Sequence, residues 1–359
     1  MCGHSHGPEF DPIACVVPPF VLEKLAESTN ATVRKAALRN LQVSVEFRSH
    51  RATVAAFSPG IAAGIPALPA GPAKLRREVY DQGKKNPPNW GLPGTLRRAE
   101  GSGATGDPAV DEAYKYSGEV WTFYKKVFGR NSIDDAGLKL ISTVHAGRGY
   151  NNAFWNGVQM VYGDGDGVVF QRFTRSLDVV GHELTHGIVQ YTSGLIYQGQ
   201  SGALNEHFAD VFGVLVVQHR RKQAASKASW LIGAELLVPA ATRKAIRSMK
   251  APGTAFINDP YLGTDPQPAH MTNLYTGPGD NGGVHINSGI LNHAFYLAAI
   301  SAKGNAWATV GPIWYQVMQN LLPTSNFADC AAQLRQVSIA WAGGKYKKAV
   351  DKALKSVGL

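Results

Sequence analysis

The sequence predicts an α+β protein of two lobes, with a β-rich N-terminal lobe and a mainly helical C-terminal lobe. Strand-like runs are concentrated between residues 77 and 170, and apolar residues at helical spacing dominate from about residue 201 onwards. Near the junction, His182 and His186 stand four residues apart in an apolar segment. Two imidazoles at this spacing lie on one face of a helix, so together they can bind one ion.

The composition is that of a soluble globular protein. The 359 residues are 44% hydrophobic and 17% charged, which suits two or three folding units with a large core. No apolar run reaches the roughly 18 residues that a membrane-spanning helix needs, so we expect no membrane partner. The start of the chain carries proline and acidic residues instead of the basic start and apolar run of a signal peptide, so we expect no classical secretion. The three cysteines are too few and too scattered for a disulfide framework and leave the compartment open.

The net charge of +10 raises the question of a nucleic-acid partner. The basic residues are dispersed, apart from a short run at 220–222 and a lysine-rich segment at 345–355. Such a terminal segment is typical of the solvated face of a helix. We therefore predict no binding of nucleic acid.

The first fifty residues predict a small helical unit. Pro18 and Pro19 open a helix that runs through Glu27, and a second helix follows at about 31–43. Two such helices form too small a core to fold alone. Residues 51–76 are rich in alanine, glycine and proline, which is typical of a linker. We predict a propeptide at 1–50 and a processing site within 51–76; the alternative is an accessory docking domain that is never removed.

Residues 77–193 predict the β-rich lobe. An amphipathic helix is expected at 111–128, followed by strands at 140–144 and 159–162. Alternating glycine and aspartate at 163–167 leads into the apolar run 168–170. We predict a hairpin here, not a calcium loop, because Asp-Gly between apolar strands favours a hairpin turn and the remaining calcium ligands are missing.

Residues 194–359 predict the helical lobe. A helix is expected from 201 through 217, with further helices in the last fifty residues. Segments 232–237, 243–249 and 286–300 alternate with loops rich in proline and glycine. We expect the core of the final helices to contain Trp307, Ile313, Trp314, Val317, Leu334, Val337 and Trp341.

The residue between the two histidines points to hydrolytic chemistry. Glu183 lies about 100° further round the helix from His182, so it can reach a water on the metal without binding the metal itself. Two ligands and a general base are the pattern of a zinc hydrolase. Chance alone gives His-Glu-x-x-His in roughly one chain in twenty of this length, so a third ligand must support the motif.

That third ligand is expected on a second helix. Glu206 follows His186 by twenty residues, which leaves room to end one helix and begin another antiparallel to it. Asp210 lies on the same face as Glu206, so either carboxylate fits from geometry alone. We favour Glu206 as the ligand and Asp210 as the partner of a ligand histidine, which normally donates its second N–H to a carboxylate. The prediction is one catalytic zinc ion with a fourth position for water.

These motifs together resemble the thermolysin-like metallopeptidases. The His182–His186 motif and the Gly202–Glu206 motif are joined by Asn152–Trp155, Arg247–Met249 and Asp280–Asn287 in the family's order. The resemblance covers roughly residues 77 to 359. The short N-terminal unit, with Val-Pro-Pro-Phe at 17–20, resembles the protealysin branch, in which a compact propeptide replaces a long one.

The resemblance implies a zinc ion in the cleft between the lobes and a set of site residues. It implies that His182, His186 and Glu206 bind zinc, that Glu183 is the base, that Asp210 orients His182, and that Asn205 supports His186. It further implies that Tyr197 and His285 stabilise the oxyanion, that Asp280 holds the His285 ring, and that Asn152, the Ala153 carbonyl and Arg247 bind substrate backbone. The pocket for the residue after the scissile bond would be lined by Phe170, Phe173, Val179, Ile232 and Ile246. Such a pocket prefers bulky apolar side chains.

The chain departs from the family pattern at the double calcium site. Asp178 matches one acidic position, but the expected companions are Val217, Leu231 and Ala234. Hydrophobic side chains cannot ligate calcium, so we hypothesise that the site is lost, although calcium elsewhere stays possible.

The tail ahead of the first helix has two interpretations. Cys2, His4, His6 and Cys15 include thiols that can latch onto zinc, but a flexible tail suits this composition better. In the second interpretation, the propeptide blocks the cleft by placing Phe20 in the apolar pocket.

The sequence therefore predicts a zinc endopeptidase made as a zymogen, with its own propeptide as intramolecular inhibitor. We expect a monomer that cuts proteins or peptides on the amino side of bulky hydrophobic residues. We expect export by a non-classical route, with a cytoplasmic precursor as an alternative. The competing hypothesis is a catalytically silent, zinc-stabilised peptide-binding protein that retains its N-terminal domain.

Overall fold

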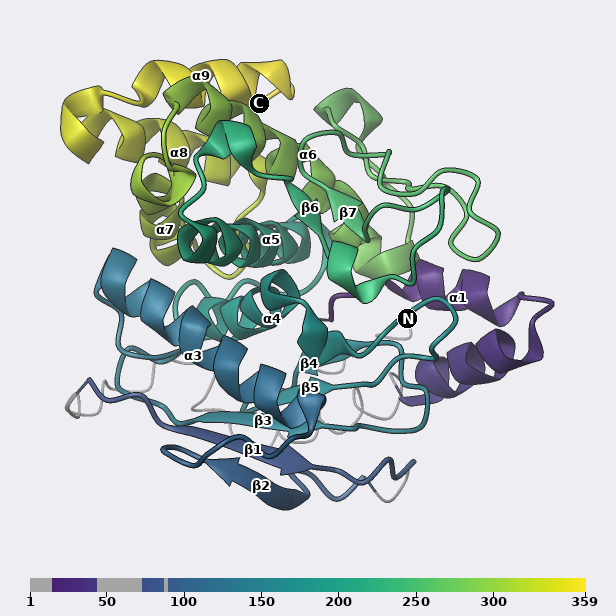
Figure 1. Cartoon of the computed structure of the whole chain (residues 1–359). Helices are drawn as coiled ribbons and strands as arrows, with labels where there is room; N and C mark the ends of the chain where they lie inside the picture. Colours follow the sequence, from purple (N-terminus) through teal and green to yellow (C-terminus); the bar gives the residue numbers. More distant parts are fainter. Residues whose placement is uncertain (1–14, 44–72, 87–89) are drawn as a thin grey trace, which may run out of the picture.

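The structure is a computed structural model that describes residues 15–43, 73–86 and 90–359. Cys2, His4, His6 and most of the expected linker at 51–76 lie outside these residues. The described chain forms a mixed sheet with helices layered over it, followed by a helical lobe (Figure 1). The predicted α+β class with two lobes is confirmed.

The N-terminal lobe is built on a five-stranded sheet in the order β2-β1-β3-β5-β4. The β1–β3 and β3–β5 pairs are parallel, whereas β2 and β4 pair antiparallel at the two edges. The strands are β1 (Arg77–Asp81), β2 (Thr95–Ala99), β3 (Leu140–Val144), β4 (Ala153–Trp155) and β5 (Met160–Tyr162). The edge strand β4 is the one that contacts the His182 helix, through the Trp155 N–H and Glu183.

Helix α3 (Pro108–Phe128) crosses one face of this sheet and packs on β1 and β3 (Figure 1). Its start is fixed by Asp107, whose side chain accepts the N–H of Ala109 at 2.9 Å, and by proline in the first turn. It ends at Gly129 in the left-handed conformation, with φ of 75°.

The prediction of a hairpin at 159–170 is wrong. Strand β5 pairs with β3 and β4, and the run 168–170 forms no strand beside it. The carboxylate of Asp166 accepts the N–H groups of Val168, Val169 and Phe170, which ties the segment into a local turn. Phe170 then bridges to Leu237 in the second lobe.

Two long helices, α4 (Leu177–Gln190) and α5 (Gly199–Arg221), pack against each other at the junction of the lobes. A Cβ atom added to Gly213 would lie 2.5 Å from the carbonyl oxygen of Asp178, and one added to Gly181 would lie 3.0 Å from the Cα of Gly213. The helices therefore approach at these glycines more closely than side chains allow. This approach brings the residues that follow Gly181 within reach of α5.

The C-terminal lobe is mainly helical and packs on α5 through α6. Its elements are β6 (Leu231–Ile232), β7 (Arg247–Ser248), α6 (Gly279–Ala302), α7 (Gly311–Asn320), α8 (Phe327–Ala340) and α9 (Lys347–Ser356). Short 3-10 turns lie at η1 (Phe173–Arg175), η2 (Ala225–Lys227), η3 (Ala234–Leu236), η4 (Met271–Asn273), η5 (Ala306–Ala308) and η6 (Trp341–Gly344). The predicted core residues are buried, except that Trp307 is half-buried and Trp341, directly after the end of α8, is 37% exposed.

The N-terminal unit packs on the rest of the chain. Helix α1 (Pro19–Ala26) contacts α6, and residues 31–43 form a second helix. Val21, Leu22 and Leu25 of α1 are buried in the same apolar cluster as the core of the two lobes.

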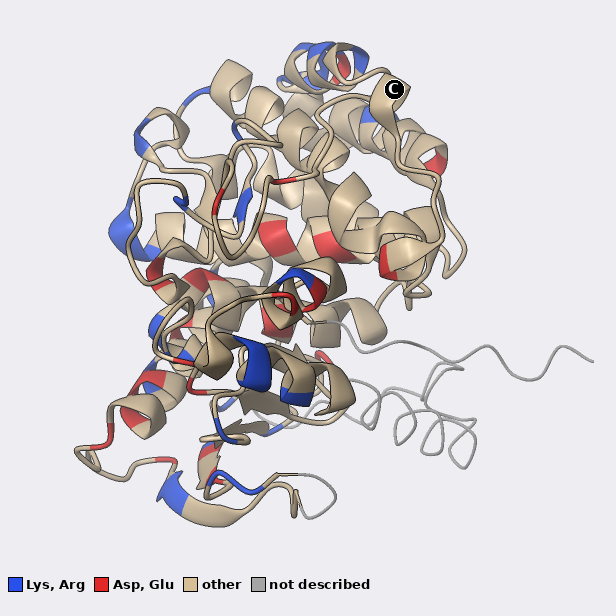
Figure 2. Cartoon of the chain, turned by 90° about the vertical axis from the view of Figure 1, so that its right-hand side faces the viewer, with Lys and Arg blue, Asp and Glu red and all other residues tan. Residues whose placement is uncertain are grey.

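Charge is spread over both lobes (Figure 2). The lysines of α9 form its exposed face, and Asp351 on the same helix pairs with Arg335 and Lys355. Across the part of the chain that the structure describes, no helix combines the length and apolar character required to cross a bilayer.

A histidine bridges the start of α3 and the loop after β5. The Nδ1 atom of His145 lies 2.8 Å from Asp164, and its Nε2 atom lies 2.9 Å from Asp107. The hydrogen bond with Asp164 contributes most to raising the pKa of His145 to about 9.

We predict that this bridge stabilises the fold in a pH-dependent way. Because the folded pKa is raised, the stabilisation is complete below about pH 6.5, the ordinary value for histidine, and is lost as pH rises through about 9. His145→Gln should therefore lower the free energy of unfolding by about 1–2 kcal/mol at pH 6 and by much less at pH 10. Denaturant unfolding of the two proteins at both pH values checks this; an equal difference at both would contradict it.

Candidate metal centre and active site

Helix α4 presents two histidines to one buried point. His182 and His186 are at most 3% exposed, and their Nε2 atoms lie 3.0 Å apart. The Nδ1 atom of His182 lies 2.8 Å from Asp210 Oδ1, and that of His186 lies 2.8 Å from Asn205 Oδ1. Because both partners are acceptors, the Nδ1 atoms carry the protons and the two Nε2 lone pairs face each other.

The two facing Nε2 lone pairs repel each other, and a cation between them would remove this repulsion. Burial lowers the pKa of His186 to about 3, so its ring is neutral and cannot relieve the repulsion by protonation. Glu206 on α5 brings a carboxylate to the same point, with Oε2 3.5 Å from His182 Nε2 and Oε1 3.4 Å from His186 Nε2. Among the described residues, Oε2 of Glu206 is buried without a hydrogen-bond partner.

These three side chains form the group suited to a metal within the described chain. Burial opposes ionisation of Glu206, but the combined influence of His285, His186, His182 and Arg247 lowers its pKa. Two neutral imidazoles and one carboxylate are the donor set of a catalytic zinc site. The residues present therefore fit a zinc ion.

Glu183 lies beside this cluster without joining it. Its Oε2 atom accepts the backbone N–H of Trp155 at 3.2 Å, so the edge strand β4 holds the carboxylate in place. Its Oε1 atom has no hydrogen-bond partner among the described residues. Burial, and then the nearby Cys15 and Glu206, raise the pKa of Glu183.

Asp210 connects the metal cluster to Arg247 and α6. Its Oδ1 atom serves His182, and the Arg247 guanidinium donates to both of its oxygens at 2.8 Å. The side-chain amide of Asn292 donates to Oδ2 at 2.9 Å. Burial opposes ionisation of Asp210, but Arg247 and His182 hold its pKa well below the usual range.

Asn292 is itself held from behind. Its Oδ1 atom lies 2.9 Å from Nδ1 of His207, whose Nε2 accepts the indole N–H of Trp314 at 2.9 Å. Burial lowers the pKa of His207 to about 4, so this ring is neutral. His207 thus points away from the metal cluster, as its position next to Glu206 on the helix predicts.

Tyr197 and His285 face the cluster from the other side. The Tyr197 hydroxyl donates to Glu206 Oε1 and lies 3.1 Å from His285 Nε2. The Nδ1 atom of His285 lies 2.6 Å from Asp280 Oδ1. Burial opposes protonation of His285, but Glu206 and Asp280 raise its pKa well above the ordinary value.

A left-handed turn places Asp280. Residues 280–283 all have positive φ, and regular helix begins only after them. Aspartate, asparagine and glycine are the residues that tolerate this conformation. The turn lets Asp280 Oδ2 accept the N–H of His285 at 2.8 Å while Oδ1 holds its ring, so one carboxylate starts the helix and orients the histidine.

The residues expected to bind substrate backbone contact the chain's own N-terminal segment. Asn152 Oδ1 accepts the N–H of Val17 at 3.0 Å, and its Nδ2 donates to the Val17 carbonyl at 3.2 Å. The N–H of Val16 points to the Ala153 carbonyl at 3.4 Å. Arg247 donates to the Val16 carbonyl at 2.8 Å. We call Cys15–Val17 the strap, because it crosses the metal cluster along the edge of β4.

The expected pocket residues are all buried and belong to one apolar cluster with Val16. The rings of Phe170 and Phe173 are 5.6 Å apart. Ile232 pairs directly with Arg247 across β6 and β7, which ties the pocket wall to the arginine that holds the strap. The full set is Phe170, Phe173, Val179, Ile232 and Ile246.

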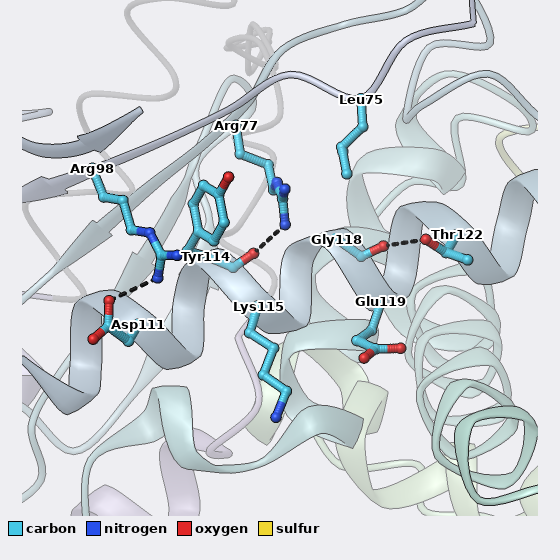
Figure 3. Close-up of a pocket in the computed structure, with 9 residues that line it drawn as sticks. All are labelled: Leu75, Arg77, Arg98, Asp111, Tyr114, Lys115, Gly118, Glu119 and Thr122. Atoms are coloured by element: carbon cyan, nitrogen blue, oxygen red, sulfur yellow. Dashed lines mark hydrogen bonds and ion pairs between the residues drawn. The ribbon is translucent and has the colours of Figure 1, made fainter. Parts of the chain in front are cut away.

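A separate hollow of about 500 Å³ lies beside α3, at Leu75, Arg77, Arg98 and Tyr114 (Figure 3). Both arginines stack on the Tyr114 ring, with each guanidinium carbon 3.8 Å from its centre. Arg77 pairs with Glu100, and Arg98 pairs with Asp111. Because these charges are already matched, the hollow offers little to a charged ligand, and the candidate site remains the buried cluster.

Two contributions to the site were absent from the sequence predictions. One is the Trp155 N–H on Glu183, which is a backbone group and has no side-chain signature. The other is Asn292, which has a signature: it lies seven residues after His285, two helical turns along the same face.

A buried set of two imidazoles and a carboxylate, with a second carboxylate beside it at a sheet edge, defines the chain as a zinc metallopeptidase. Residues 74–190 match the catalytic domain of the thermolysin metallopeptidases, and residues 193–359 match their alpha-helical domain. The chain belongs to the thermolysin metallopeptidase family.

Individual relatives agree with this assignment. The chain is 48% identical to an extracellular metalloprotease of Pectobacterium carotovorum subsp. carotovorum over 86% of its length and 84% of that protein. It is 56% identical to protease PrtS of Photorhabdus sp. (strain Az29) over 68% of its length and 65% of that protein. The solved precursor of protealysin from Serratia proteamaculans matches with a TM-score of 0.85 at 42% identity, over 96% of this chain and 99% of that one.

We predict that Asn292 positions the metal ligands through Asp210. Asn292→Ala removes one donor from Asp210, so the zinc dissociation constant should rise by about three- to tenfold, less than the roughly 10–100-fold expected for Asp210→Ala. Chelator competition on the full-length chain measures both. His293→Ala is the matched control, because its ring stacks on Tyr296. If Asn292→Ala lowers the thermal stability but leaves the zinc affinity unchanged, the prediction is contradicted and the role of Asn292 is structural.

Proposed function

We propose that the chain is the autoinhibited zymogen of a zinc endopeptidase that cuts peptide bonds on the amino side of bulky hydrophobic residues. The observation that carries this proposal is the strap, which takes the contacts expected of a substrate backbone: Asn152, Ala153 and Arg247. The likeness to the precursor of protealysin supports the zymogen.

The proposed mechanism uses His182, His186 and Glu206 as zinc ligands. A bound zinc ion lowers the pKa of water from about 15.7 towards about 7 and polarises a carbonyl. Glu183, whose Oε1 is free of other hydrogen bonds among the described residues, takes the proton of the attacking water and later passes it to the leaving amine.

His285 and Tyr197 are proposed to stabilise the oxyanion. Asp280 fixes the His285 ring, so its Nε2 atom faces the reacting carbonyl without a loss of orientation. Each such donor is worth roughly 10²–10³ in turnover. Arg247 is proposed to bind the carbonyl of the substrate residue that follows the scissile bond. Two hydrogen bonds to Asp210 anchor the Arg247 guanidinium for this contact.

The specificity follows from the pocket lined by Phe170, Phe173, Val179, Ile232 and Ile246. Arg247 contacts the carbonyl of Val16. We therefore propose that Val16 occupies this pocket, and not Phe20, which lies four positions later. Burying a polar side chain there without a partner costs about 1–3 kcal/mol, which favours bulky apolar residues.

A catalytically silent peptide-binding protein is the less favoured alternative, since the relatives are named as proteases. We propose that residues 1–50 act as the propeptide, with 77–193 and 194–359 as the two lobes, and that maturation cuts within 51–76. The relative named as an extracellular metalloprotease supports export, which we propose to be non-classical and to follow a cytoplasmic precursor stage.

We predict that Glu183→Ala keeps zinc but abolishes catalysis. Loss of the general base should cut turnover on an apolar peptide by roughly 10²–10⁴-fold, and the variant should stay full length because it cannot process itself. Metal analysis, peptide hydrolysis and electrophoresis provide the measurements. Glu235→Ala, at an exposed position, should behave as the parent. A purified Glu183→Ala precursor that still matures alone would argue against self-processing.

We propose that the double calcium site is lost. The Asp178 carboxylate accepts the N–H of Val179 and of Gly233, each at 2.8 Å, and the Ser176 hydroxyl, so protein donors already occupy it. Burial raises the pKa of Asp178, which further disfavours its use as a calcium ligand.

Calorimetry should accordingly detect no tight calcium binding that depends on Asp178. Asp178→Ala should also leave the response of the melting temperature to calcium unchanged, because the described residues supply no set of several oxygen ligands at this position. Tight binding that Asp178→Ala abolishes would overturn the proposal.

A further inference from the structure

The strap crosses the metal cluster and pairs antiparallel with β4 through a single bridge. Cys15 bridges to Phe154, and the N–H and C=O of Val17 are both bound by Asn152. Main-chain pairing of this kind fixes the direction and the register of a bound peptide. The strap is therefore held at one register along β4.

That register is set by two successive carbonyls. The Val16 carbonyl accepts from Arg247 at 2.8 Å, and the Cys15 carbonyl lies 2.8 Å from His285 Nε2. One peptide bond, Cys15–Val16, lies between them. The backbone of Val16 is also within reach of the Glu183 carboxylate, so the base and the oxyanion donor flank the same bond.

The Cys15 side chain lies beside the cluster. Its thiol contacts the Val17 carbonyl at 3.5 Å, is near Glu183 and His285, and is outside the group formed by His182, His186 and Glu206. The backbone of the strap presents the Cys15 carbonyl to His285.

We propose that the Cys15–Val16 bond is a self-processing site: the zinc-loaded precursor hydrolyses the strap that inhibits it. The inference rests on the proposed peptidase function. Water adds its hydroxyl to the Cys15 carbonyl carbon, the C–N bond breaks, and the remaining proton goes to the Val16 nitrogen. The products are a Cys15 carboxyl group and a Val16 amine, with no change in oxidation state.

The cut removes residues 1–15 but does not free the site. Val16 and Val17 are fully buried, Asn152 and Arg247 still hold them, and α1 directly behind them packs on α6. The clipped chain is therefore a precursor that retains its inhibitor on the leaving-group side until the linker is cut.

Intact-mass spectrometry of the full-length precursor tests the proposal. Zinc added to metal-free precursor should yield a species that begins at Val16 in the parent but not in Glu183→Ala. A precursor that hydrolyses an added apolar peptide, or cuts its linker, while every species keeps Cys15–Val16 intact would overturn this inference alone. A zinc-loaded precursor that cuts nothing would contradict the proposed function and this inference with it.

A second measurement requires no turnover. Cys15–Val16 is the only Cys-Val pair in the sequence, so ¹³C-carbonyl cysteine and ¹⁵N-valine labelling gives one correlated NMR signal. In the full-length Glu183→Ala precursor, zinc should shift this signal, because the Cys15 carbonyl faces the metal ligands. The same titration of Asn152→Ala in that background should shift it less, because the strap loses its anchor. An unchanged signal on zinc saturation would contradict the register proposed here.

Discussion

Two buried imidazoles whose Nε2 lone pairs face each other, with the nitrogen atoms 3.0 Å apart, are the constraint on which the rest of the structure depends. Burial lowers the pKa of His186 to about 3, so protonation of this ring does not relieve the repulsion. Three buried carboxylates, those of Glu206, Glu183 and Asp210, lie around this point, and Arg247 pairs with two of them, Asp210 and Glu206. A dication bound by the two Nε2 atoms and the Glu206 carboxylate relieves the lone-pair repulsion.

The helix packing makes this arrangement possible and also limits it. Gly181 and Gly213 let α4 and α5 approach until Glu206 reaches both histidines. Asp210 then serves two functions from one carboxylate, since it orients a metal ligand and anchors the arginine that binds the peptide carbonyl. The histidine of the candidate metal site and the arginine that holds the strap therefore share one buried hydrogen-bond network, which Asn292 joins through Asp210.

Much of this site could be predicted from the sequence because its geometry is local. The spacing of His182 and His186 defines a helix face. The segment around them is long enough for its helical periodicity to be recognised in the sequence. The choice between Glu206 and Asp210 could not be made from spacing, because both lie on one face; the structure separates them by distance to the Nε2 atoms. The predicted hairpin at 159–170 was wrong because β5 forms its hairpin with the preceding strand β4 and pairs on its other side with the distant strand β3.

No sequence pattern could reveal that the inhibitor uses the catalytic contacts. A plug that merely covered a cleft would leave His285, Arg247 and Asn152 unengaged, whereas each of them bonds to the strap backbone. Backbone contacts carry no side-chain preference, so they hold a segment equally well whether it is a substrate or an inhibitor. Under the proposed cleavage of Cys15–Val16, the difference between the two lies in the segment on the leaving-group side of the bond: a free substrate leaves, whereas the buried face of α1 tethers Val16. The proposal therefore attributes inhibition to slow product release, which the proposed cut in the linker ends.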